Sequence, residues 1–258
     1  MEGFLKNGYV FDEETGSSVA IVTAVSYHNL DNHYGIRTWQ ANQWNAYLNA
    51  IYQGNWEGGG LVDNDHRLSA GLSLNYDKYD ESLNTSPIPN SPNSYPLDRW
   101  EVTPGIFAEY SYRYADMLSV VAGLRLDYST KYGVFVTPRA NVRYTPFEWW
   151  TMRASAGLGY RSPNAIADNA FVLPSSRGLI LADDIGQERA ANTGFSTTFY
   201  IPLGSKQLQL SAEYYYTHFF NSLIVDMDRD PHMVYLYNQT DIGGRSFSHC
   251  AQVEARHH

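Results

Sequence analysis

Acidic, histidine and serine residues are the first candidates for chemistry in this 258-residue sequence, but their spacing supports no reaction. The acidic run at 226–230 resembles the start of a calcium-binding loop, yet the required glycine is missing and Tyr237 stands where the distal glutamate belongs. The pair Asp183 and Asp184 lies in a polar stretch, where solvated carboxylates are the simpler interpretation. The sequence has no nucleophile elbow and no glycine-rich phosphate loop. We therefore predict no enzyme activity, no cofactor and no metal site.

Charged side chains instead recur at alternate positions of five segments, which are 106–114, 118–128, 134–144, 152–161 and 208–216. One set of alternate positions holds nine charges and the other set holds none. Side chains of a strand point to opposite faces in turn, so the pattern predicts strands with one charged and one apolar face. The charged face must contact water, because unpaired charges are costly to bury. The nine residues are Glu109, Arg113, Arg125, Asp127, Arg139, Arg143, Arg153, Arg161 and Glu213.

The apolar face of these segments ends repeatedly in tyrosine, and the sequence contains 21 Tyr and 6 Trp. Rings with a polar tip suit the boundary between water and lipid, where membrane barrels carry aromatic girdles. No stretch approaches the ~20 apolar residues of a spanning helix. A membrane protein of this kind must then be a closed barrel, the other structure that satisfies its backbone in lipid. A soluble β-sandwich with a binding function remains the alternative, since tyrosine also favours strands.

The fold class predicted from this pattern is all-β. We expect an antiparallel up-and-down meander of about ten strands that forms part of a larger transmembrane β-barrel. The expected strands are 18–28, 38–53, 67–77, 102–114, 118–128, 134–145, 151–161, 190–201, 206–226 and 233–256. Pro138 lies inside one of them, and because proline cannot donate to a ladder we expect a local bulge there.

The connections differ in length, which is typical of outer-membrane barrels. Short turns are expected at 115–117, 146–150 and 202–205. Successive connections of a meander alternate between the two ends of the sheet, which places the turn at 54–65 at the same end as these short turns. The long loops 78–97 and 162–189 fall on the opposite side, where the loop near 227–232 joins them. Loops on a rigid scaffold carry recognition, and aromatic and arginine side chains supply most binding energy. Candidate ligand contacts on this outer rim are Tyr95, Arg99, Trp100, Tyr160, Arg161, Asn164, Asn169, Phe171 and Arg177.

Composition and the terminal residues exclude several classes of partner and of structural feature. The formal net charge is −9, so there is no basic footprint for nucleic acid. Cys250 is the single cysteine and allows no internal disulfide. The opening residues lack the basic and apolar stretches of a signal peptide. The pair at 257–258 resembles the remnant of a purification tag, which leaves 1–256 as one expected domain.

Four sequence segments resemble a known family. Residues 151–164 read TMRASAGLGYRSPN, and QER follows at 187–189 after a long loop. Residues 212–224 read AEYYYTHFFNSLI, and GGRS stands at 243–246. In order and spacing these segments resemble the C-terminal half of a TonB-dependent outer-membrane receptor, with the cobalamin receptors as one candidate subgroup. The resemblance is best over 102–256.

The resemblance implies a bacterial outer-membrane receptor that takes up a scarce, bulky nutrient such as cobalamin, a metal chelate or a glycan. Such receptors have ~22 strands around a plugged lumen, so this chain would be truncated at both ends, would lack the plug domain and would be inactive alone. The implied partners are the missing plug domain of the same parent chain, the TonB energy-coupling complex, outer-membrane lipid and the small-molecule nutrient. A non-energised porin or adhesin-type barrel is the alternative.

The resemblance also assigns a place to most of the charged residues. They would face the lumen, either as ion pairs solvated by water or as contacts that grip the plug domain. These residues are Glu109, Arg113, Arg125, Asp127, Arg139, Arg143, Arg153 and Glu213.

Overall fold

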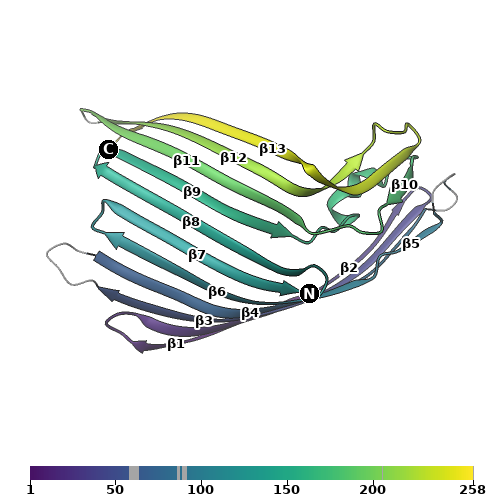
Figure 1. Cartoon of the computed structure of the whole chain (residues 1–258), viewed down its shortest axis with the longest axis horizontal. Coiled ribbons are helices and arrows are strands. Elements are labelled where there is room, and N and C mark those ends of the chain that lie inside the picture. Colours follow the sequence, from purple (N-terminus) through teal and green to yellow (C-terminus); the bar gives the residue numbers. More distant parts are fainter. Residues whose placement is uncertain (58–63, 86–87, 89–91, 205, 258) are drawn as a thin grey trace.

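A computed structural model describes residues 1–57, 64–85, 88, 92–204 and 206–257. Within this part the strands form a single sheet (Figure 1), in the order β1-β2-β3-β4-β6-β7-β8-β9-β11-β12-β13-β10, with β5 paired to β4. The long strands are β1 (Glu2–Asp12), β2 (Ser17–Tyr34), β3 (Arg37–Glu57), β4 (Asn64–Asn84), β6 (Arg99–Tyr114), β7 (Leu118–Ser129), β8 (Gly133–Phe147), β9 (Trp150–Arg161), β11 (Glu188–Leu203), β12 (Lys206–Asp226) and β13 (Met233–His257).

Three short elements lie in the connections: β5 (Ser94–Pro96), the 3-10 helix η1 (Ala167–Val172) and β10 (Gly178–Leu181). All ten predicted strands are present. The antiparallel meander is confirmed, although β10 pairs with β13 in parallel. The sequence analysis missed β1, β5 and β10. No described helix is both long and apolar enough to cross a membrane.

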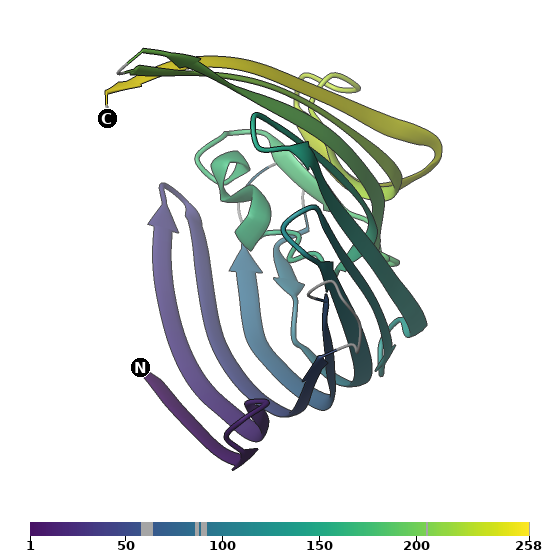
Figure 2. The same ribbon diagram turned by 90° about the vertical axis from the view of Figure 1, so that its left-hand side faces the viewer.

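The sheet curls into an open trough, with β1 along one edge and β13, partly covered by the short β10, along the other (Figure 2). Strands twist with a fixed hand, and the twist accumulates across many neighbours until the sheet curves. In the described part no second sheet packs against either face, because all thirteen strands belong to the same sheet. The soluble β-sandwich alternative is therefore wrong.

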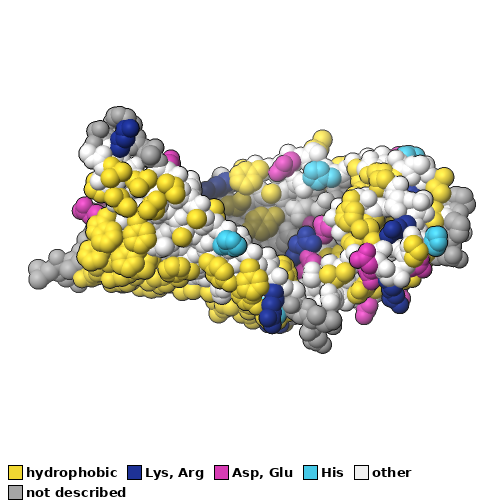
Figure 3. All heavy atoms as spheres, turned by 90° about the horizontal axis from the view of Figure 1, so that it is seen from above, with side chains coloured by type: hydrophobic (Ala, Val, Ile, Leu, Met, Phe, Trp, Pro, Cys, Tyr) yellow, Lys and Arg dark blue, Asp and Glu magenta, His cyan; other side chains and the backbone are white. Residues whose placement is uncertain are grey.

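The convex face carries the predicted apolar columns. Register aligns them from strand to strand, as in the row Ala108, Leu124 and Pro138. Leu124 is 55% exposed and Val134 is 67% exposed. Figure 3 shows apolar side chains over much of the outer surface and charged side chains within the hollow. A face this apolar and this exposed needs a lipid solvent.

Glycines on the concave face make room for side chains of neighbouring strands. A Cβ built at Gly105 would overlap the carboxylate of Asp127, its partner in register. A Cβ at Gly194 would lie 2.5 Å from the Tyr215 ring, which again belongs to the register partner. These glycines let polar and aromatic side chains lie flat along the wall, where a larger residue would push them away.

Pro138 does not create the expected bulge, so that prediction is wrong. The register between β7 and β8 runs through it without a shift. The ladder from β8 to β9 begins only at Arg139, so the missing N–H of Pro138 lies beyond the end of that ladder. The irregularity of β8 falls instead between Tyr144 and Phe147, beside the short turn.

The connections follow the predicted sides but not a strict alternation in length. The turns at 115–117 and 148–149 are short, whereas 162–187 is long. Two connections on the long-loop side, at 35–36 and 130–132, are as short as the turns opposite. Parts of the turn predicted at 54–65 and of the loop 78–97 lie outside the described residues, as does His258.

Aromatic rings gather at the short-turn end of the sheet, where the tyrosine pattern predicts an interfacial girdle. Trp149 stacks on Phe147 with ring centroids 5.3 Å apart, and Trp150 stacks on Phe199 at 5.7 Å. Trp56 stacks on His66 at 5.5 Å in a second group. Such rings suit the depth at which lipid head groups meet water.

Candidate ligand site on the concave wall

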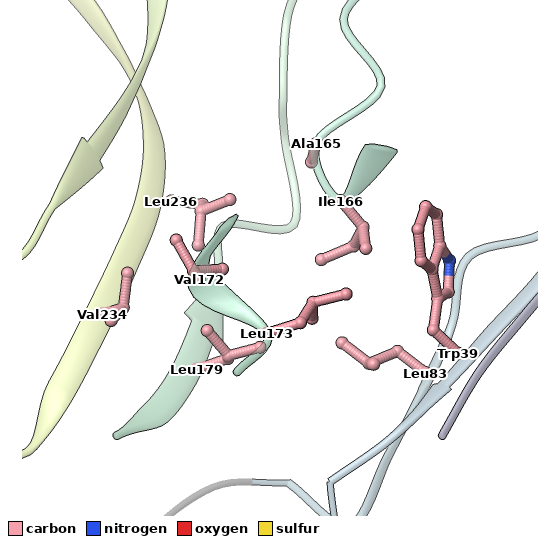
Figure 4. Close-up of a cluster of buried hydrophobic side chains, with 9 residues drawn as sticks. All are labelled: Trp39, Leu83, Ala165, Ile166, Val172, Leu173, Leu179, Val234 and Leu236. Atoms are coloured by element: carbon pink, nitrogen blue, oxygen red, sulfur yellow. The ribbon is translucent and has the colours of Figure 1, made fainter. Parts of the chain in front are cut away.

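The connections at the long-loop end fold together into a cap over the trough. Its apolar core joins β3 and β4 to η1, β10 and β13 (Figure 4). The core residues are Trp39, Leu83, Ala165, Ile166, Val172, Leu173, Leu179, Val234 and Leu236. Tyr95 donates to the carbonyl of Leu179, and Arg177 donates to the carbonyl of Met227 at 2.8 Å. These contacts agree with the prediction that the 78–97, 162–189 and 227–232 loops share one side of the sheet.

One arginine anchors the cap to the sheet. The Arg37 side chain is 1% exposed, and its Nη1 donates to the carbonyls of Val172 at 2.9 Å and Leu173 at 2.8 Å. Its Nη2 donates to the carbonyl of Arg177. Helix-end carbonyls lack partners of their own, and a guanidinium can satisfy several at once. The cap is thus a packed unit rather than a set of free loops.

Below the cap a cavity of 610 Å³ opens on the concave wall. Six strands contribute to it, and its lining mixes aromatic rings with charges of both signs. The lining residues are Tyr47, Asn75, Asp77, Tyr79, Arg99, Glu101, Thr103, Arg125, Asp127, Phe135, Thr137, Gly159, Tyr160, Arg161, Ser162 and Gln187. A concavity of this size with convergent polar groups is the usual form of a small-molecule site.

Arginine and carboxylate pairs fix one part of the cavity lining. Arg125 donates to its strand neighbour Asp127 at 2.6 and 2.7 Å, and to Ser73 at 2.7 Å. Asp127 is 3% exposed, so this buried carboxylate is paired as its burial requires. Arg99 lies 3.3 Å from the buried Glu81 and 3.8 Å above the ring of Tyr79. These contacts hold two guanidinium groups against the wall.

Glu101 and Arg161 are among the other charged residues of the cavity lining. Glu101 accepts hydrogen bonds from Ser129 at 2.6 Å and Ser162 at 3.2 Å, and it forms no ion pair within the described residues. Arg161 joins Glu188 at 2.6 Å and Asp168 at 3.2 Å, so it ties β9 to β11 and to η1. The cavity can therefore offer a ligand acceptors and donors as well as aromatic faces.

The predicted ligand contacts separate into two groups. Arg99, Tyr160 and Arg161 line the cavity together. The other six do not line it. Four of them make hydrogen bonds within the cap, namely Tyr95, Asn164, Asn169 and Arg177. Phe171 is 61% exposed. Trp100 is 59% exposed and lies next to Arg99, which faces inward. The difference arises because hydrogen bonds close the cap on itself, and because adjacent strand residues face opposite sides.

Several cavity residues were missed in the sequence, although the alternation of side chains along each strand predicts them. Asp77 and Tyr79 continue the polar column of β4, and Glu101 and Thr103 begin that of β6. Asp77 and Thr103 lie within the expected strands 67–77 and 102–114, and one further alternate position in each column would have found Tyr79 and Glu101. Tyr47, on the polar side of β3, gave no such signal because that strand carries few charges.

The predicted lumen charges lie on the concave face, and they differ in their partners. Arg139 reaches across β7 to Glu109, Arg113 pairs with Asp65, and Arg125 pairs with Asp127. Within the described residues, Arg143, Arg153 and Glu213 form no ion pair. No group of three or more metal-ligating side chains occurs in the described part either. Five of the eight predicted lumen charges thus have an ionic partner, and the exceptions lie on β8, β9 and β12.

Comparison with known proteins agrees with this geometry. A family model described as TonB dependent receptor-like, beta-barrel matches residues 4–246. No curated protein sequence matches the chain.

Solved structures with the same fold include three receptors. The siderophore receptor PirA from Pseudomonas aeruginosa matches with a TM-score of 0.57 and 12% identity over 98% of this chain and 49% of its own. The hemophore receptor HasR of Serratia marcescens was solved as a double mutant in complex with its hemophore HasA and heme. It matches with a TM-score of 0.57 and 14% identity over 99% of this chain and 49% of its own. The alcaligin outer-membrane receptor FauA from Bordetella pertussis matches with a TM-score of 0.56 and 12% identity over 99% of this chain and 46% of its own.

The chain spans about half the length of these receptors. The porin and adhesin alternative does not fit the family match, and the family is one of transport receptors rather than enzymes. By its family match over 4–246 and its amphipathic curved sheet, this chain belongs to the TonB-dependent receptor-like β-barrels of the bacterial outer membrane.

Proposed function

We propose that this chain forms about half of the barrel of a receptor that takes up a scarce, bulky nutrient with energy from the TonB complex. The observation that carries the proposal is the 610 Å³ cavity on the concave wall, roofed by a packed cap. A receptor must hold its cargo at the outer end before any energised step, and we assign the long-loop end, where the cavity lies, to the outside. The remaining strands, a plug domain in the lumen and outer-membrane lipid complete the proposed assembly.

Metal chelates are the first class of cargo to test. The structural neighbours are receptors for siderophores and for a heme-bearing hemophore, which favours a chelate over cobalamin or a glycan. The cavity lining suits such a cargo, because rings such as Tyr47 and Phe135 offer flat contacts while Arg99 and Arg161 offer charge. The isolated chain is proposed to be inactive, since it would leave the edge strand β1, and β13 beyond its short pairing with β10, without partners.

The test uses the complete receptor and a panel of ferric siderophores, haem and cyanocobalamin. Tyr47→Ala and Phe135→Ala remove rings from the cavity, and each should weaken binding of the recognised compound about tenfold. Trp100→Ala removes a ring from the outward face of β6 and is the matched control. Equal loss in all three variants, or no loss in the cavity variants, would place recognition elsewhere.

A second measurement addresses energy coupling. Uptake of the same compound should stop in cells that lack TonB, whereas binding to the cell surface should persist. Uptake that continues unchanged without TonB would instead support a non-energised barrel.

A further inference from the structure

Two arginines face each other across neighbouring strands of the concave wall. Arg143 on β8 and Arg153 on β9 are direct partners in register, in the half of the sheet nearer the short turns. Directly opposed like charges destabilise a strand pair. Within the described residues, neither guanidinium has an ion-pair or hydrogen-bond partner. Every other arginine of the predicted lumen column, namely Arg113, Arg125 and Arg139, has its own carboxylate.

The surroundings of the pair form a small hollow with a mixed polar and apolar lining. Its volume is 240 Å³, and Ser119, Asn141, Ser155 and Tyr215 line it together with the two arginines. The hollow exists partly because Gly194 has no side chain at this point of the wall. Two arginines and several hydroxyl-bearing residues thus border one space that is large enough to admit an acidic side chain.

The same register row shows why the wall itself does not neutralise the pair. From Arg143 the row runs through Arg153 and Ser196 to Glu213 on β12. Glu213 is the nearest acid along the row, two strands away from Arg153. Arg139 on β8 spans a similar gap to reach Glu109 on β6. There the intervening strand β7 contributes Gly123, which has no side chain and leaves a clear path. Ser196 stands in the corresponding place here, and no ion pair forms.

We propose that Arg143 and Arg153 form a carboxylate-binding site for an acidic side chain of the plug domain. The inference rests on the proposed function, since it requires a polypeptide that fills the lumen. Charge complementarity selects the occupant: two arginine forks bind a carboxylate with paired, charge-assisted hydrogen bonds. Depth also favours the plug over cargo, because the site lies toward the short turns, whereas the cap and the 610 Å³ cavity lie at the other end.

The test places a photo-crosslinking residue at Asn141 in the complete receptor. Irradiation should join the barrel to a plug peptide that contains aspartate or glutamate, identified by mass spectrometry. The double variant Arg143→Gln with Arg153→Gln should lower the crosslink yield roughly tenfold, as expected for loss of charge-assisted hydrogen bonds. Arg139→Gln is the matched control and should leave the yield unchanged, because Arg139 already pairs with Glu109.

A reciprocal exchange guards against a folding defect. Arg153→Glu should abolish the crosslink, and changing the identified plug acid to arginine should restore it. A crosslink that is insensitive to the double variant, or one to a peptide without an acid, would overturn the carboxylate site while the proposed receptor function stands. If no peptide of a plug domain reaches the probe and TonB-dependent uptake is also absent, both the site and the proposed function are wrong.

Discussion

Leu124→Arg tests the assignment of the convex face to lipid. Leu124 is 55% exposed and lies near the middle of β7, six residues after Leu118. At ~3.3 Å per residue and a tilt of ~40°, it stands about 15 Å above the start of the strand, close to the middle of an apolar band about 25–30 Å tall. A guanidinium at that depth should lower the free energy of unfolding by about 2–4 kcal/mol.

Ser69→Arg is the matched control on the concave face. Ser69 neighbours Ala70, which lies at the depth of Leu124 through the register row Ala70, Ala108 and Leu124. An arginine at 69 would stand in lumen water directly opposite Glu109, so its cost should be about 0–1 kcal/mol. Gly123 would be a poor control, because Arg139 packs over it.

The assay is reversible unfolding of the complete receptor in phosphatidylcholine vesicles, followed by tryptophan fluorescence during a guanidinium chloride titration. Folded barrel is checked separately by its altered mobility on an unheated gel. Equal costs for Leu124→Arg and Ser69→Arg would refute the assignment of faces. A larger cost at Ser69 would reverse it.

Three further predictions concern the wall and its cap. Gly105→Ala should destabilise the receptor by about 1–3 kcal/mol, because its Cβ would displace Asp127 and Arg125, whereas Gly159→Ala has open space and should change stability by less than about 0.5 kcal/mol; equal effects in a denaturant titration would contradict this. Arg37→Gln should remove the guanidinium donor from the carbonyls of Val172 and Leu173, which leaves Val172 only its bond from the Ser175 N–H, and amide exchange of 164–181 should rise at least tenfold while β7 and β8 stay protected; unchanged exchange would show that the apolar core alone holds the cap. Arg161→Gln should change overall stability by under about 1 kcal/mol, since the side chain is 58% exposed, yet it should speed proteolysis near Asp168; a large global loss would mean that the pair is more important than its exposure indicates.

The alternation of side chains along each strand determines which face of the sheet each residue occupies. Nine charges on one set of alternate positions predicted which face of each strand meets water, and register leaves little freedom once one face is apolar. The same period could have reached Asp77, Tyr79 and Glu101, because each simply extends a column already identified. Arg99 and Arg161 were chosen instead as arginines on the long-loop side, and Trp100 was chosen with them although it points to the opposite face.

The tertiary structure decided what local sequence cannot encode. The segment of β1 lacks a clean alternation, and it becomes a strand because β2 offers an edge to pair with. The cap depends on contacts between residues more than 130 positions apart, such as Arg37 with Val172 at a sequence separation of 135. The partners of the arginines on the concave face also follow from the sheet, since Glu109 and Arg139 meet only because two strand turns bring them across Gly123. Alternation along one strand is a local property of the backbone, but which side chains meet across strands depends on register and chain topology, and these exist only in the folded sheet.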